Sequence, residues 1–174
     1  MKKIAFSLIA CLSLAGSVFA GHQMSGGKDY KGGPSTPCFH DQELQLDVFG
    51  LYGWTAKGNH DDGFGGGLGV NYFFTENFGV GVDGSVRDAD PALWTASASL
   101  IARFPIDLGS TCLAPYVLAG GGLQANGTIT GEWHAGGGLE FRVAPNFGVF
   151  TEGRYFWAEN NDQIQARLGF RVVF

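Results

Sequence analysis

Charge, cysteine and long apolar runs are scarce in this sequence. Of its 174 residues, 16% are charged and three are cysteines, and beyond residue 20 no stretch is apolar for long enough to form a transmembrane helix. No sustained helical period is present either, which disfavours an ordinary helical domain. Basic residues form no run and are outnumbered by acidic ones, so we expect no nucleic-acid partner.

The first twenty residues have the pattern of a secretory signal peptide. Lys2 and Lys3 form a positive start, residues 4–18 are an uncharged apolar run, and Ala20 is a small residue at the expected cleavage site. A transmembrane helix is the alternative, but spanning a membrane needs about 20 apolar residues. We therefore expect residues 1–20 to be a signal peptide and the rest to be one exported domain.

Residues 21–42 are rich in Gly, Ser, Lys and Pro and contain few apolar residues, so we predict a flexible periplasmic tail. Residues 43–174 then alternate between apolar and polar with a period of two, which is typical of strands. Turn-like clusters divide this region into eight segments, and they lie at 57–63, 75–77, 88–91, 105–110, 125–131, 145–146 and 159–162.

Charge is sorted by parity within these segments. In each segment one parity is apolar and uncharged, and because side chains of one parity share a face of a strand, one face of the sheet must be dry. The opposite parity carries ten charged residues, namely Asp47, Asp83, Arg87, Arg103, Glu140, Arg142, Glu152, Arg154, Arg167 and Arg171. Two folds fit this pattern: a soluble barrel with an apolar interior, or a membrane barrel with a polar interior.

The aromatic residues favour the membrane barrel. With strands running alternately up and down, all four tryptophans fall at one rim in the apolar parity, and phenylalanines fall at the other rim. Pairs such as Trp94 and Phe104 are ten residues apart, a rise of about 25 Å for tilted strands, which is the height of the apolar band of outer-membrane barrels. We therefore predict an all-β, eight-stranded antiparallel up-and-down transmembrane β-barrel over residues 43–174. Its aromatic girdle is Trp54, Trp94, Trp133 and Trp157.

Residues 167–174 resemble the C-terminal signal of bacterial outer-membrane barrels, with Gly169, Val172 and Phe174 at its glycine, apolar and terminal aromatic positions. Residues 114–122 and 152–155 resemble the fifth and seventh strands of the small eight-stranded barrels. These include the transmembrane domain of outer membrane protein A and the opacity-type surface proteins. The resemblance covers residues 43–174. It implies a location in the outer membrane, recognition by the barrel-assembly machinery, and contact with outer-membrane lipids and lipopolysaccharide.

The inward charges indicate what the barrel does. Buried charges must pair, because an unpaired buried charge is costly. We predict a lumen network of Asp47, Asp83, Arg103, Glu140, Arg142, Glu152, Arg154, Arg167 and Arg171. The interpretation we favour is a structural surface protein with a plugged polar interior, which contributes to envelope integrity or surface presentation. The alternative is a narrow channel for ions or small solutes.

A lipid-modifying enzyme of the outer membrane is the third hypothesis. Such an enzyme needs a nucleophile and a base on the lipid side, and no Ser/His pair occupies neighbouring outward positions. We therefore expect no catalytic residue, no cofactor and no metal centre. Acidic residues at the tryptophan rim are assigned to solvated loops, and the alternative is that they bind divalent cations. These residues are Asp61, Asp62, Asp88, Asp90, Glu132, Glu159 and Asp162.

Once the signal peptide is removed, Cys38 and Cys112 are the two remaining cysteines. Cys38 shortly precedes the first strand and Cys112 ends the turn between the fourth and fifth strands, so both lie on the periplasmic side. The periplasm is oxidising. We predict a disulfide that holds the tail as a lid over the barrel, the alternative being two unpaired thiols.

Overall fold

The computed structural model describes residues 38–57, 62–107, 112–159 and 162–174. The predicted signal peptide, residues 1–20, and residues 21–37 of the predicted tail lie outside this part of the chain. Among the described residues, no helix is long and apolar enough to cross a membrane.

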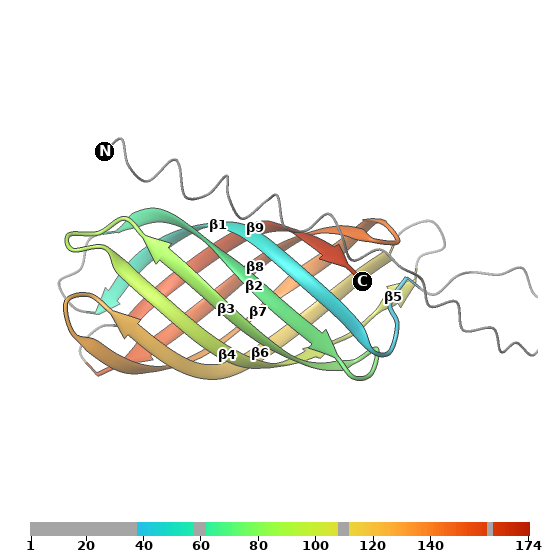
Figure 1. Ribbon diagram of the computed structural model, residues 1–174, viewed down its shortest axis with the longest axis horizontal. Coiled ribbons are helices and arrows are strands. Elements are labelled where there is room, and N and C mark those ends of the chain that lie inside the picture. Colours follow the sequence, from blue (N-terminus) through green and yellow to red (C-terminus); the bar gives the residue numbers. More distant parts are fainter. Residues whose placement is uncertain (1–37, 58–61, 108–111, 160–161) are drawn as a thin grey trace, which may run out of the picture. The chain divides into compact units, whose positions relative to one another are not determined.

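Strands account for most of the described chain (Figure 1). They are β1 (Glu43–Lys57), β2 (Gly63–Phe73), β3 (Phe78–Arg87), β4 (Leu93–Arg103), β5 (Ile106–Asp107), β6 (Cys112–Ala125), β7 (Ile129–Ala144), β8 (Phe147–Ala158) and β9 (Asp162–Val173).

Eight of these strands form a closed antiparallel ring. Consecutive long strands pair with each other, β4 pairs with β6, and β9 closes the ring onto β1. The short β5 lies in the predicted turn at 105–110 and pairs only with the beginning of β6. Closure leaves the ring without an open sheet edge, the arrangement that a sheet in hydrocarbon requires. The predicted fold class is therefore confirmed.

The turn between β6 and β7 is shorter than predicted. The sequence predicts a turn over 125–131, but pairing continues to Ala125 and resumes at Ile129. Gly127 has φ of 77°, a left-handed conformation that glycine adopts readily, so the chain reverses within residues 126–128. The predicted boundary was wrong because polar and glycine-rich residues here belong to the paired strand.

Burial follows the predicted parity along each strand. In β1, Leu46 and Val48 are exposed on the outer surface, whereas the alternate residues Asp47 and Phe49 are buried. The interior of an eight-stranded barrel is just wide enough for side chains to fill it. The apolar residues therefore cover the outside of the barrel, and the polar residues fill its interior.

The two ends of the barrel carry different residues. Cys38, Cys112 and the C-terminal Phe174 mark one end, which we call the disulfide end. The opposite end, which we call the tryptophan end, carries four tryptophans with exposed rings. They are Trp54, Trp94, Trp133 and Trp157.

Candidate functional site

The interior of the barrel is the candidate functional site, because it concentrates almost all buried ionisable side chains of the described chain. All nine residues of the predicted lumen network lie inside, each with a side chain that is more than nine-tenths buried. The described interior holds six carboxylates against six guanidinium groups, so its formal charge is balanced. The carboxylates are Glu43, Asp47, Asp83, Glu132, Glu140 and Glu152, and the arginines are Arg87, Arg103, Arg142, Arg154, Arg167 and Arg171.

The layer nearest the disulfide end is built on two carboxylates. Glu43 Oε1 accepts hydrogen bonds from Arg103 Nη1 at 2.8 Å and from Arg142 Nη2 at 2.5 Å. Glu140 accepts a bond from Arg142 Nε and a second from Arg171 Nη1 at 2.5 Å. Each bond has an ionised donor and an ionised acceptor, which makes these the strongest class of protein hydrogen bond. This layer ties β1, β4, β7 and β9 together across the lumen.

Arg171 carries the network toward the middle of the barrel. Its Nε and Nη2 donate to the two carboxylate oxygens of Asp47 at 2.7 and 2.6 Å, a bidentate arrangement. Asn71 Nδ2 donates to Asp47 at 2.8 Å. One arginine therefore satisfies Asp47 on β1 and Glu140 on β7 at the same time.

A second cluster lies on the tryptophan side of this layer. Asp83 accepts bonds from Arg154 Nη1 at 2.6 Å and Arg167 Nη1 at 3.1 Å. Glu152 accepts a bond from Arg154 Nε at 2.5 Å, and the Tyr116 hydroxyl donates to its other oxygen at 3.0 Å. The partners come from β3, β6, β8 and β9, so this cluster also spans the lumen.

Inward glycines make room for these long side chains. A Cβ on Gly138 would lie 2.6 Å from the Tyr116 hydroxyl oxygen, and a Cβ on Gly169 would lie 2.7 Å from the Phe150 ring. Both separations are too short for real atoms. A larger residue at either position would displace an aromatic ring that packs beside the charge network.

The network leaves little empty space in the middle of the barrel. The enclosed cavity there has a volume of about 10 Å³, and its lining includes Asp47, Asp83, Glu152 and Arg154. Such a volume has room for about one water molecule. The described interior is therefore packed with side chains at this height.

Two interior carboxylates were not identified from the sequence. Glu43 has the same parity as Asp47 and stands at the first position of β1, but it was not included in the predicted network. Glu132 was assigned to a solvated acidic loop, and this prediction was wrong, because Glu132 lies in β7 and is only 3% exposed. Its parity matches that of Glu140, a signal that was available in the sequence.

Glu132 belongs to a different kind of cluster, which lies in the tryptophan-end half. The Ser97 hydroxyl donates to Glu132 at 2.8 Å, and His134 Nδ1 lies 3.2 Å from both Glu132 carboxylate oxygens. His134 Nε2 lies 2.8 Å from the Ser99 hydroxyl oxygen. A serine, a histidine and a carboxylate are thus connected in the order of a catalytic relay.

The serine and the histidine of this cluster are buried. Ser99 and His134 are 6% and 2% exposed, and neither lines the interior cavity, but Ser99 contributes to the lining of a hollow of about 450 Å³ with Val80 and Leu100. The cluster joins β4 and β7 by buried hydrogen bonds.

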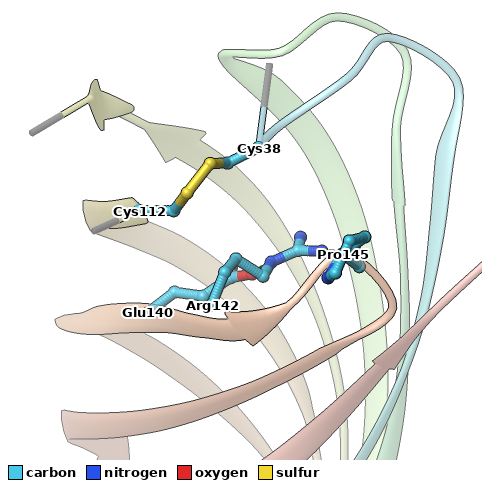
Figure 2. The surroundings of a disulfide bond; sticks show 5 residues. All are labelled: Cys38, Cys112, Glu140, Arg142 and Pro145. Atoms are coloured by element: carbon cyan, nitrogen blue, oxygen red, sulfur yellow. Dashed lines mark hydrogen bonds and ion pairs between the residues drawn. A yellow bond between two sulfur atoms is a disulfide. The ribbon is translucent and has the colours of Figure 1, made fainter. Parts of the chain in front are cut away.

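Two residues that precede β1, Cys38 and Phe39, pack against the disulfide end of the interior. The predicted disulfide between Cys38 and Cys112 is present, with Cα atoms 5.9 Å apart. Figure 2 shows the bond beside Arg142 and Glu140 of β7. The next residue, Phe39, is 4% exposed, and its ring centroid lies 4.6 Å from the Arg103 guanidinium carbon and 4.9 Å from that of Arg142. The bond therefore holds an aromatic ring over the outermost charged layer.

Comparison with known proteins shows which solved structures share this fold. No protein-family model and no curated protein sequence matches the chain. Solved structures do match. The N-terminal β-barrel domain of Pseudomonas aeruginosa OprF aligns with a TM-score of 0.64 and 19% identity, covering 78% of this chain and 99% of that domain.

Two further structures align with the same region. Neisserial surface protein A aligns with a TM-score of 0.58 and 18% identity, covering 75% of this chain and 95% of its own. The attachment invasion locus protein Ail of Yersinia pestis aligns with a TM-score of 0.57 and 16% identity, covering 77% and 99%. The chain therefore has the fold of the small eight-stranded outer-membrane β-barrels, as the resemblance implied. These neighbours support the predicted location in the outer membrane.

Proposed function

We propose that this chain is a structural protein of the outer membrane, in which a charge network plugs the barrel and its short loops face the cell surface. The filled interior carries this proposal, because arginine–carboxylate clusters cross the lumen in two layers and leave a cavity of about 10 Å³ between them. The fold shared with envelope barrel proteins supports the same conclusion.

The tryptophan end faces the cell surface in this proposal, and the disulfide end faces the periplasm. The exposed indole rings then lie at the boundary between acyl chains and lipopolysaccharide headgroups, where a ring with an apolar body and a polar N–H is most stable. The apolar outer band contacts the acyl chains of the outer-membrane lipids.

Conductance across a planar lipid bilayer tests the plugged interior. We expect the purified barrel to insert without producing regular current steps, because the two charged layers leave a cavity of only about 10 Å³ between them. A porin of large pore, inserted in the same way, provides the positive control. Reproducible steps from the barrel protein would instead support the narrow channel for ions or small solutes.

We further propose that β9 is the segment recognised by the barrel-assembly machinery. Phe170 and Phe174 are exposed on the outer face of this strand and its end, and Val172 lies between them on the same parity. We expect Phe174→Ala to accumulate in the periplasm, whereas Phe141→Ala, at the same end of the barrel, reaches the outer membrane. Membrane fractionation after export provides the measurement, and equal outer-membrane levels of the two variants would contradict the proposal.

A further inference from the structure

Arg87 differs from every other arginine of the described chain. It is the last residue of β3 and is 1% exposed, but Nε, Nη1 and Nη2 all lack a hydrogen-bond partner among the described residues. The other five arginines each bond to at least one carboxylate. A buried guanidinium with no acceptor is costly, since it has given up its hydration without replacement.

Glycines on the neighbouring strands determine where the Arg87 side chain lies. A Cβ on Gly63 in β2 would lie 3.7 Å from Arg87 Cγ, and a Cβ on Gly53 in β1 would lie 2.7 Å from Arg87 Cδ. The side chain therefore extends along the inner wall from β3 past β2 to β1. The guanidinium lies over Gly53, within the tryptophan-end half of the interior.

Further polar groups without partners lie on the strands that the guanidinium reaches. Gly53 pairs in register with Gln165, and Thr55, the next inward position of β1, pairs with Gln163. Gln163 is 0% exposed, and neither its Nε2 nor the Thr55 Oγ1 has a hydrogen-bond partner in the described chain. The groups on these strands thus include the Gln163 amide N–H and the Thr55 hydroxyl, both able to donate a hydrogen bond and both without a partner in the described chain.

The counter-charge available in the described chain is weak. The exposed Asp62 attracts Arg87 electrostatically, but it forms no ion pair or hydrogen bond with it, and its Oδ1 accepts a bond from the Thr55 backbone N–H at 2.9 Å. Glu132 of β7 is already bonded to Ser97 and His134. No described carboxylate therefore compensates Arg87 directly.

We propose that Arg87, with Gln163 and Thr55, forms a binding site for a small oxyanion inside the tryptophan-end half of the barrel. Phosphate or sulfate matches the chemistry, because a planar guanidinium offers two parallel N–H donors to such an anion. The site lies inside the barrel, so the ligand is a free anion and not a lipid headgroup on the outer surface. This site is independent of the proposed structural function.

Inorganic phosphate is the probe that tests the proposal. The folded barrel is held in a neutral sugar-headgroup detergent, which excludes phospholipid headgroups, and phosphate binding is measured by titration calorimetry against sodium chloride of equal ionic strength. We expect saturable binding to the wild type and binding that is roughly tenfold weaker or more in Arg87→Gln, the effect of losing a charge-assisted hydrogen bond. Lys57→Gln removes an exposed cation of the same end, and we expect it to bind as the wild type does.

Three results would overturn the site: no saturable binding to the wild type, equal binding by Arg87→Gln, or an equal loss in Lys57→Gln. Heat-modified gel mobility shows whether each variant has folded. If Arg87→Gln does not fold, Gln163→Leu provides the second test, because it removes one donor and keeps the arginine. We expect weaker binding in that variant, and unchanged binding would equally overturn the proposal.

Discussion

The two halves of the barrel interior satisfy their polar groups in different ways. Toward the disulfide end, arginines and carboxylates form ion pairs across the lumen, as between Arg142 and Glu43, and between adjacent strands, as in the bidentate contact of Arg171 with Asp47. Toward the tryptophan end, the inward residues are mostly amides, hydroxyls and a histidine, and several have no partner among the described residues. The comparison shows that one inward parity can produce an ion-pair network in one half and, in the other, more polar atoms without a partner among the described residues.

The difference has a physical origin in side-chain length and charge. Arginine and glutamate reach from opposite walls and meet near the barrel axis, and their opposite charges compensate the cost of removing them from water. Serine and threonine are too short to reach the facing wall. The disulfide-end half therefore stabilises the barrel, whereas the tryptophan-end half has donors left to bind a ligand.

The largest expected effect comes from removing one charge of the ion-pair network. Glu140→Gln leaves Arg142 and Arg171 buried without their full counter-charge, so we expect a loss of about 3–5 kcal/mol in the free energy of unfolding. Glu132→Gln in the other half is the matched control, with an expected loss of about 1–3 kcal/mol, because its partners are Ser97 and His134. Urea unfolding in lipid vesicles measures both. Equal losses would remove the distinction between the halves.

The disulfide is expected to contribute next. It joins residues 74 apart in the sequence, so opening it enlarges the unfolded ensemble, and we expect Cys38→Ser with Cys112→Ser to lose about 2–4 kcal/mol. A reducing agent should destabilise the wild type equally and leave the double variant unchanged. Mass spectrometry of the unreduced protein supplies an independent check, and two free thiols in protein from intact envelopes would contradict the bond.

The stability cost of an arginine substitution on the outer surface should depend on its height in the membrane and not on the residues inside the barrel. Leu100 is 70% exposed on the middle of β4, and Trp94 lies on the same face at the tryptophan end. We expect Leu100→Arg to cost about 2–4 kcal/mol and Trp94→Arg about 0–1 kcal/mol from the transfer of the guanidinium alone. Heat-modified gel mobility reports the folded fraction. Equal folded fractions of the two variants would show that the height assigned to the apolar band is wrong.

The smallest effect is expected within the tryptophan-end half. Ser99→Ala removes one hydrogen bond to His134, so we expect a loss of about 0.5–1.5 kcal/mol in stability. We also expect a fluorophosphonate probe, which labels activated serines, to leave the wild type unmodified. Labelling of the wild type that disappears in Ser99→Ala would identify a nucleophile and would revive the hypothesis of a lipid-modifying enzyme.

Much of the fold was predictable from the sequence because strand parity is a local property. The exposed Leu46 and Val48 and the buried Asp47 follow from the period of two alone. Predictions were wrong where a local pattern has two meanings. Glu132 was placed in a loop because glycine and acidic residues are common in turns, whereas here Gly131 and Glu132 continue the pairing of β7 with β6.

The sequence alone determined the eight strands, the face on which each side chain lies, the position of the tryptophans at one rim and the pairing of the two cysteines. It did so because alternation, rim spacing and cysteine number are all properties of position along the chain. Only the tertiary structure decided which charges meet. Arg142 and Glu43 are 99 residues apart and meet across the lumen from nonadjacent strands. Arg171 and Asp47 are 124 residues apart and meet because the ring closes by pairing β9 with β1. The same register leaves Arg87 without a carboxylate partner in the described chain, and glycines on β2 and β1 leave room for its side chain along the inner wall.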